Sequence, residues 1–536
     1  MSSISTAGRM NPAGAIVALL AVLALSACSF APRYERPEMD MPSQWQKVDA
    51  GAAPLNTDWW TRFNDPVLTS MVDEALKNNQ DLAESLAKID SAASQVGIAT
   101  ADLLPAVSGS AGSVAAGASE KTPNTTPFNK SGLSRTTATN QAALNASWEL
   151  DLWGKYRNNY TMLSDVLMST VIGHEALRLS VAGQTAQGYF ALLALDMQLD
   201  TARRTLKTRE DAFSIYTSRY KQGDITELDW QRARAEVETA RAQVHTSTVA
   251  VDKAEAGLAV LLGRSPRDIM ERGMPRGQAI GMLPSPPVVP EGLPSDLLQR
   301  RPDVRASEFT MMAYNANIGV ARAQFFPSIS LTGMLGTVSS AVGSLFTGPA
   351  GAWSYGVTGS MPLLDFGRTW YNVKDAEARK NASIAVYRKT VQTAFQDMRT
   401  ALTTQREADA IVRSMQIQVE SLRRATTIAR LQYDNGYTDY LTVLDAERQL
   451  FAAELQLAAA LRDRLNSVVS VCMALGGGWN DPGASPSFPV VSTEKLLDQE
   501  TSTGALGKAP VSGKAAPQPV KAQPATQDQS KGGVSL

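Results

Sequence analysis

The feature of the sequence that most constrains its fold is an internal duplication. Residues 66–266 and 288–479 align as two copies of one unit, at an offset of 222 early in the unit and 213 late in it. Gly97-Ile-Ala-Thr-Ala-Asp-Leu-Leu-Pro105 matches Gly319-Val-Ala-Arg-Ala-Gln-Phe-Phe-Pro327, and further on Tyr220-x-x-Gly223 matches Tyr433-x-x-Gly436. A period of about 200 residues is too long for an ordinary solenoid. The pattern predicts a chain built from two equivalent halves joined by a linker, residues 267–287.

The first residues have the composition of an export signal. A positive charge at Arg9 precedes a short apolar run, and the run ends in Leu25-Ser26-Ala27-Cys28. A run this short is typical of a signal peptide, residues 1–27, and not of a spanning helix. The last four residues match the bacterial lipoprotein pattern, so we expect Cys28 to be lipidated and residues 28–65 to form a lipidated N-terminal segment. An ordinary signal peptide with a chance cysteine is the alternative.

Composition excludes several classes of protein. The net charge is -1, so nothing indicates binding to nucleic acid. Cys472 is the only other cysteine. Once Cys28 is lipidated, no disulfide can form within the chain, and core packing or assembly must hold the fold. Residues 480–536 are rich in Pro, Ala, Ser, Gly, Gln and Lys without apolar periodicity, which predicts a disordered tail.

Most of the chain is predicted to be helical. No proline occurs from Lys155 to about Lys221 or from Arg368 to about Asn435. Each run is about 66 residues, or about 100 Å as a helix. This is longer than globular helices and indicates a coiled coil or a helical tube. Shorter helices are predicted at Pro66–Asp102, Glu227–Leu262, Ser295–Gln324 and Thr438–Leu475.

Two segments, residues 104–150 and 326–364, have strand periodicity instead. In the second, Ile329, Leu331 and Leu335 alternate with small polar residues, which is the period of a strand with one apolar face. Strands of about ten residues with one apolar face suit a membrane β-barrel. A soluble hairpin with one buried face is the alternative. Aromatic residues near the predicted strand ends would form a girdle: Trp148, Trp153, Phe325, Phe326, Trp353 and Tyr355.

The strand count implies assembly. Two hairpins supply four membrane strands, and four strands leave edges that lipid cannot satisfy. A closed barrel needs at least about eight strands. We therefore expect a homotrimer with a twelve-stranded barrel continued by a tube of long helices. The predicted fold class is mainly α with a membrane β-barrel, built from a duplicated helix–β-hairpin–helix unit.

Several blocks of sequence resemble a known family over about residues 28–480. The chain resembles the TolC-like outer membrane factors, most closely the lipoprotein branch that serves resistance–nodulation–division efflux pumps. The resemblance implies a trimeric, passive exit duct for drugs or other small compounds, with a twelve-stranded outer membrane barrel, a periplasmic helical tunnel, a periplasmic adaptor and an inner-membrane pump as partners. The blocks are the lipidation pattern at Cys28, Arg300-Arg301-Pro302-Asp303-Val304-Arg305, Gly319 through Pro327, Pro362-Leu-Leu-Asp365-Phe-Gly367-Arg368, and Gly436-Tyr-Thr-Asp-Tyr-Leu441-Thr-Val-Leu-Asp445-Ala-Glu-Arg448.

The resemblance also implies where such a duct closes. It places the constriction near Tyr220–Asp229 and Tyr433–Arg448, with Asp445 at the tightest point. Three copies of Asp445 would form an acidic ring that repels anions and attracts cations, and Leu441, one turn away, could add an apolar ring. Without the motif, Asp445 would be a solvated charge on a helix. Candidates for the contacts that hold the gate shut are Tyr433, Asp229 and Arg448. The turns at residues 219–229 and 432–442 are the expected adaptor docking surface.

Catalysis and cofactor binding have no support in the sequence. His174 and His245 lie far apart and in no metal-ligand spacing, and no phosphate-binding loop or nucleophile elbow is present. We therefore expect no enzyme, no cofactor and no metal. Two other functions remain open: the outer membrane duct of a type I protein or peptide secretion system, and a lipid-anchored coiled-coil adhesin.

Overall fold

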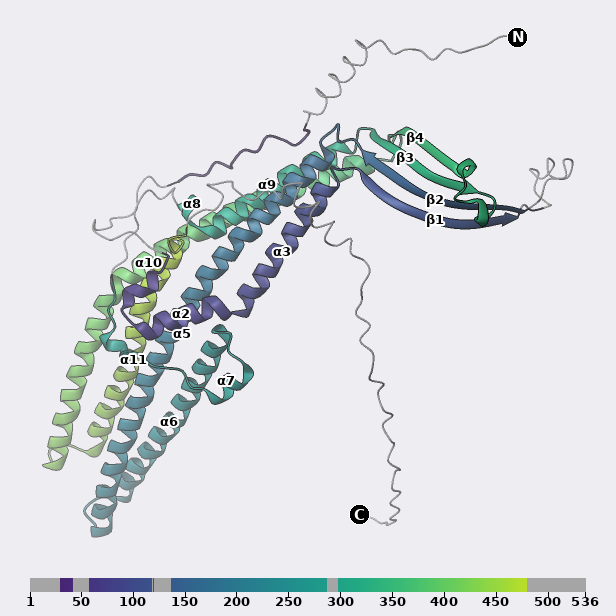
Figure 1. Ribbon diagram of the computed structural model, residues 1–536. Coiled ribbons are helices and arrows are strands. Elements are labelled where there is room, and N and C mark those ends of the chain that lie inside the picture. The colour runs from purple at the N-terminus through teal and green to yellow at the C-terminus, as the bar shows by residue number, and fades with distance from the viewer. Residues whose placement is uncertain (1–28, 42–56, 118, 120–135, 287–296, 480–536) are drawn as a thin grey trace, which may run out of the picture. The chain divides into compact units, whose positions relative to one another are not determined.

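The computed structural model describes residues 29–41, 57–117, 119, 136–286 and 297–479. The predicted signal peptide, Cys28 and the predicted tail 480–536 lie outside these residues. The described residues form one sheet joined to two long helical hairpins (Figure 1). None of the described helices combines the length and the apolar character needed to cross a membrane.

The four strands form one antiparallel sheet in sequence order. They are β1 (Ala106–Gly117), β2 (Thr136–Glu149), β3 (Ser328–Ser339) and β4 (Gly351–Ser360). Ala106 pairs with Ser147 in the first hairpin, and Ser328 pairs with Ser360 in the second. These two pairs are related by the sequence offsets of 222 and 213. The predicted duplication is therefore also present in the strand register.

One face of the sheet is apolar and exposed. The register places Leu144 and Trp353 on either side of Leu335, so the alternating apolar residues of three strands share one face. Leu335 and Trp353 are 66% and 70% exposed. A soluble hairpin would bury this face, whereas a membrane strand turns it towards lipid. Tyr355 stacks on Trp353 but lies in the middle of β4, so the expectation that it sits at a strand end is wrong.

The two long helices begin and end in the same way. They are α5 (Lys155–Gln222) and α10 (Arg368–Asp434), of 68 and 67 residues. Each follows a glycine of positive φ, Gly154 or Gly367, and each is followed by a turn containing another, Gly223 or Gly436. Left-handed backbone favours glycine, and it reverses the chain here. The turns lead into α6 (Glu227–Leu261) and α11 (Tyr440–Ala474).

Two of the predicted helices are each interrupted. The segment Pro66–Asp102 forms two helices because Asn79 breaks it, and the Asn79 side chain accepts hydrogen bonds from the backbone N–H groups of Asp81 and Leu82. The segment Ser295–Gln324 breaks at Arg301, since the residue before a proline avoids helical backbone. The resulting helices are α2 (Pro66–Asn78), α3 (Gln80–Ala101), α8 (Leu297–Arg300) and α9 (Pro302–Ala323). The remaining short elements are η1 (Trp59–Phe63), α7 (Pro266–Glu271), η3 (Ile280–Met282), η5 (Val342–Ser344) and η6 (Gly348–Ala350).

The helices follow a fixed order of contacts. Next to the sheet, α3 packs on α5, α5 on α9 and α9 on α10 (Figure 1). Towards the turns, α6 packs on α5, α5 on α11 and α11 on α10. In both regions α10 is the last element in the order. Among the helices, the main contacts between the two repeats of one chain are therefore those of α5 with α9 and of α5 with α11.

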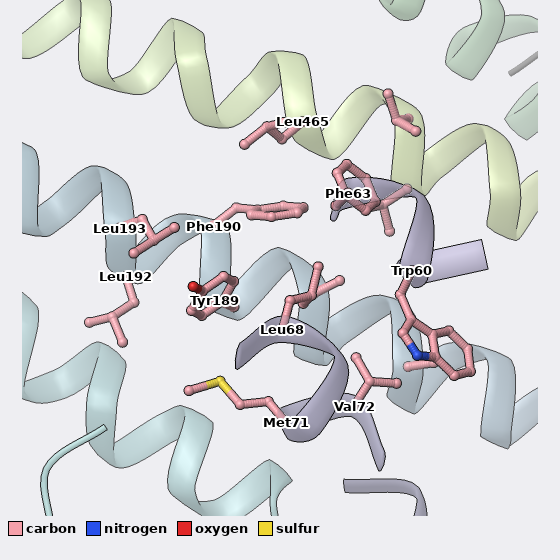
Figure 2. Close-up of a cluster of buried hydrophobic side chains, with 14 of the residues drawn as sticks. Trp60, Phe63, Leu68, Met71, Val72, Tyr189, Phe190, Leu192, Leu193 and Leu465 are labelled. Carbon is pink, nitrogen blue, oxygen red and sulfur yellow. The ribbon is translucent and has the colours of Figure 1, made fainter. Parts of the chain in front are cut away.

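The main hydrophobic core lies about halfway along α5. Tyr189, Phe190 and Leu192 of α5 pack against Phe63 and residues of α2 and α11 (Figure 2). Burying each such side chain stabilises the fold by about 1.5–3 kcal/mol. Cys472 is fully buried in the same cluster, as expected for a small hydrophobe, and burial raises the pKa of its thiol to about 12.

The segment Ser29–Met41, which we call the N-terminal strap, lies along α9. Phe30 stacks on Phe326 with ring centroids 4.5 Å apart. The Arg36 guanidinium donates two hydrogen bonds, of 2.7 and 2.8 Å, to the buried carboxylate of Glu308. Tyr34 donates a further one to the same carboxylate. Bidentate, charge-assisted bonds of this kind are among the strongest in proteins, so Glu308 is the main attachment point of the strap.

Replacing Glu308 should release the strap. In a Glu308→Gln variant the ion pair with Arg36 is lost, and the docked state of the strap becomes less stable by about 2 kcal/mol. Trypsin should then cut faster after Arg33, measured by mass spectrometry of the N-terminal fragments. Glu35→Gln is the matched control because that side chain is exposed. Equal cleavage rates in the two variants would contradict this account.

Acid should release the strap as well. Burial raises the pKa of Glu308, but the pairs with Arg36 and Arg305 outweigh it and leave the pKa below its usual value of 4.5. The ionised carboxylate therefore stabilises strap docking fully at any pH above its usual pKa. This stabilisation is lost as the pH falls through the lower pKa that Glu308 has in the folded chain. Cleavage after Arg33 by a protease active in acid should rise only below the usual pKa.

Candidate channel gate at the helix tips

Three tyrosines join the two helical hairpins near their turns. Tyr216 of α5 lies 4.6 Å from Tyr440 of α11, and Tyr433 of α10 lies 5.4 Å from Tyr440, measured between ring centroids. Burial raises the pKa of all three phenols, so they stay neutral. Tilted and edge-on aromatic pairs of this kind contribute about 0.5–1.5 kcal/mol each beyond burial. This tyrosine cluster places the predicted residue Tyr433 at a contact between the two repeats.

A buried carboxylate forms a second contact between the hairpins. Glu236 of α6 has a side chain only 5% exposed and binds two arginines. The Arg209 guanidinium of α5 lies 2.8 Å from one carboxylate oxygen, and Arg448 of α11 donates to the other at 2.8 Å. We call these residues the tip ion triad. It gives the predicted residue Arg448 a partner from the other repeat.

The position of Glu236 in the sequence indicates that its carboxylate is buried. Ala233, Val237 and Ala240 lie on the buried face of α6, and Glu236 falls on that face. A charged residue on the buried face of an amphipathic helix needs a partner. Sequence periodicity could therefore have marked Glu236, although it could not have identified Arg448 as its partner.

Asp229 has a local role within this chain. Its carboxylate accepts a 2.8 Å hydrogen bond from Thr226, whose own hydroxyl oxygen caps the first turn of α6. It also lies 3.6 Å from Arg232. Its charge contributes to raising the pKa of Tyr433. The structure therefore brings Asp229 into the electrostatic surroundings of Tyr433 but not into contact with Arg448.

Asp445 and Leu441 share the exposed side of α11, away from the hairpin contact. Leu441 is 48% exposed, and the Asp445 carboxylate is bound only by Gln449 of the next turn, at 2.6 Å, among the bonds seen in the described residues. Val443 and Leu444, on the other side, pack with the tyrosine cluster. The side chains of both predicted pore residues are thus exposed and free to contact another copy of the chain or to line a pore.

The described residues offer no group of three His, Cys, Asp or Glu side chains that could hold a metal ion. His174 instead shares a 2.6 Å hydrogen bond with Ser85, linking α5 to α3. Asp439 is the N-cap of α11 and accepts a hydrogen bond from the backbone N–H of Thr442. Hydrogen bonds from Thr442 lower the pKa of Asp439. These groups therefore have structural partners near them in the chain or in the neighbouring helix.

An exposed apolar sheet that is continued by long helical hairpins defines a subunit of an outer membrane channel. The chain belongs to the outer membrane efflux protein family, whose model matches residues 71–264 and 293–477. The two matched segments fall within the two repeats. It is therefore an efflux channel of the bacterial outer membrane with a periplasmic helical tunnel, which confirms the family, the efflux function and the outer membrane location predicted from the sequence.

Known proteins of the family are similar over most of their length. The outer membrane protein OprJ of Pseudomonas aeruginosa is 34% identical over 481 residues, covering 88% of this chain and 97% of OprJ. The cation efflux system protein CusC of Escherichia coli is 32% identical over 463 residues, covering 85% and 97%. The crystal structure of the Campylobacter jejuni CmeC outer membrane channel superposes with a TM-score of 0.79 at 28% identity, covering 88% and 98%. Channels of this kind act with an adaptor and an inner-membrane pump in tripartite systems.

Replacing Glu236 in the tip ion triad should destabilise the helix tips and leave the rest of the fold unchanged. Glu236→Gln leaves two guanidinium groups around a neutral side chain and should cost about 3 kcal/mol locally. Hydrogen exchange of the amides near the turns of α5–α6 and α10–α11 should then accelerate. Glu238→Gln, on the same helix with an exposed partner in Arg241, should cost less than about 1 kcal/mol. Indistinguishable exchange in the two variants would show that the triad does not hold the hairpins together.

Proposed function

We propose that three copies of this chain form the outer membrane exit duct of a tripartite efflux pump. The observation that carries this proposal is the sheet, in which no strand of the described residues pairs with the outer edge of β1 or β4. Backbone groups facing lipid must be paired, so the sheet must be completed by further strands. Three copies supply twelve strands, an even number within the range of closed outer membrane barrels.

The duct closes at the helix tips. Asp445 and Leu441 lie on the exposed side of α11, where threefold symmetry would gather them into an acidic ring and an apolar ring. The contacts that hold the closed state are the tyrosine cluster with Tyr433, the tip ion triad with Arg448, and the charge of Asp229. An adaptor that docks at the turns 219–229 and 432–442 would open the gate by separating the hairpins.

The chain is anchored and supplied by other components. Lipid on Cys28 would hold the N-terminus in the outer membrane, and the strap supports this because Ser29 bonds to Asn158 near the start of α5. Energy would come from an inner-membrane pump of the resistance–nodulation–division type, so the chain itself acts passively and not as an enzyme. The cargo would be drugs or other small toxic compounds.

Shortening the side chain at Asp445 should open the duct. In planar bilayers the folded trimer should show low, gated conductance, and Asp445→Ala should raise it severalfold, because alanine side chains would leave a wider constriction than three carboxylates. Asp463→Ala is the matched control, because that carboxylate lies on the same helix and pairs with Arg462. A folded trimer without any conductance would reject the channel, and an equal rise in both variants would reject Asp445 as the gate.

Deletion of the gene should sensitise its host. Strains lacking the chain should be inhibited by lower concentrations of dyes, detergents or antibiotics, and the wild-type gene should restore growth. A Cys28→Ala variant should restore it less well, since the lipid anchor is lost. Unchanged susceptibility across the panel, with loss of a secreted protein instead, would favour the secretion duct over the efflux duct.

A further inference from the structure

A cavity lies between the two long helices at the point where two shorter helices end. α9 begins at Pro302 and α11 ends at Ala474, and both of them pack on α5 and α10 (Figure 1). The cavity at this junction, which we call the wall cavity, measures about 870 Å³, a volume that suits a drug-sized molecule. Leu179 of α5, Ile411 of α10 and Met473 of α11 make part of its lining apolar.

Arg301 holds two carboxylates in the wall cavity. Its guanidinium donates to both oxygens of Asp303, at 2.8 and 3.0 Å, and to Oδ2 of Asp397 at 3.2 Å. It also donates to the carbonyl of Ala474 at 3.4 Å. Nearly all of its N–H groups are therefore in use, and the side chain is only 10% exposed. Arg301 is thus not available to an anion, and the three side chains together carry a net negative charge.

The wall cavity also contains acceptor atoms without a donor. Within the part of the chain that the structure describes, nothing donates to Oδ1 of Asp397, whose side chain is 45% exposed. The side-chain oxygen of Asn466 is buried, and it too accepts no hydrogen bond from the described residues. The third lining carboxylate, Asp463, pairs with Arg462 instead. Unpaired acceptors and a net negative charge are complementary to a ligand with a positive charge.

The wall cavity lies on the side of α11 that carries the proposed gate residue. Ser470, in the lining of the cavity, follows Asp445 by about seven whole helical turns, so the two residues share one side of the helix. Gln456, about three turns after Asp445, lines a smaller cavity of about 290 Å³ between α10 and α11. Leu465 and Cys472 lie about half a turn away from this side and belong to the main hydrophobic core. In the proposed trimer both cavities would therefore face the lumen.

We propose that the wall cavity is a binding site for cargo, and that its ligands are organic cations with an apolar body. The carboxylates of Asp397 and Asp303 bind the positive charge, and the apolar lining around Met473 binds the rest of the molecule. The inference rests on the proposed efflux duct, since only then does the cavity face the path of the cargo, and it names one class of substrate. A weak site of this kind raises the local concentration of cations in the duct and still releases them.

The unpaired carboxylate of this site belongs to the second repeat alone. The repeat counterpart of Arg301 is Asn79, whose side chain donates to the end of α6 as Arg301 donates to the end of α11. The junction between the short helices is thus built in the same way in the first repeat, but without this charge. The counterpart of Asp397 is the neutral residue Gln184. A trimer would therefore offer three such sites, one for each chain.

Binding of a cationic dye to the full-length trimer in phosphatidylcholine nanodiscs tests the site. Ethidium is the probe, because it combines a positive charge with planar apolar rings, and its fluorescence anisotropy reports binding. Asp397→Asn should weaken its affinity about fivefold, because the charge that pairs with the dye is lost from a partly exposed site. Asp375→Asn is the matched control. It removes the same charge from the same side of α10, about six turns away, where Asp375 pairs with Arg379, and it should leave the affinity unchanged.

A second variant tests the location of the site without a change of charge. Ser470→Phe places a ring inside the wall cavity and should remove most of the ethidium binding, whereas Ser470→Ala should bind the dye as the wild-type chain does. Circular dichroism and native mass spectrometry should show that each variant keeps its helix content and still forms trimers.

Each outcome decides a different claim. Weaker binding in both Asp397→Asn and Ser470→Phe, with both controls unchanged, supports the site. Absence of ethidium binding to the wild-type trimer overturns the inference and leaves the proposed function standing. Equal affinities of Asp397→Asn and Asp375→Asn, or full binding in Ser470→Phe, do the same. A trimer that binds ethidium at this site, but neither conducts in planar bilayers nor restores drug resistance, overturns the proposed function itself.

Discussion

The structure depends on one constraint, the need of every backbone group in lipid for a hydrogen-bond partner. A four-stranded sheet meets it only at its interior strands, so the chain must find further strands at β1 and β4. The pairing of β2 with β3 meets the same need between the repeats of a single chain. Each long helix begins a few residues after the strand that closes a hairpin, so the sheet also sets where α5 and α10 start.

Periodic features of this fold could be predicted from the sequence, and single contacts could not. The strands and the long helices follow from apolar alternation and from proline-free runs, and the ends of α5 and α10 follow from glycines. The break at Asn79 was missed because a side-chain cap within a helical run gives no periodic signal. The break before Pro302 could have been found from the proline alone. The position of Glu236 on the buried face of α6 could have been found from periodicity, but its pairing with Arg448 could not, because Arg448 comes from the other repeat. Asp445 and Cys28 remain predictions, one from a motif and one outside the described residues.

The two kinds of contact between repeats differ at the helix tips. Within a chain the tyrosine cluster and the tip ion triad hold the hairpins together. The offset of 213 converts Tyr216 and Tyr440 into Ala429 and Glu227, and the triad into Leu422, Gln449 and Ala235. In the proposed trimer, the contacts between copies would therefore lack both devices. The two repeats thus share one fold, but their sequences have diverged at the tips. The contact within a chain is therefore more stable there than the contact between copies.

The uninterrupted length of α5 has a mechanical consequence. Its main core contacts, at Tyr189 and Phe190, lie close to its midpoint, with about 33 residues on either side. At 1.5 Å per residue, each arm of this lever is about 50 Å long. A rotation of about 5° at the core would move the far end by about 4 Å, more than the width of a water molecule. A small rearrangement of packing midway along the helix thus produces a larger displacement at its ends. Conversely, a partner bound only at the tip needs a smaller force to rotate α5 about its core contacts than one bound near the core.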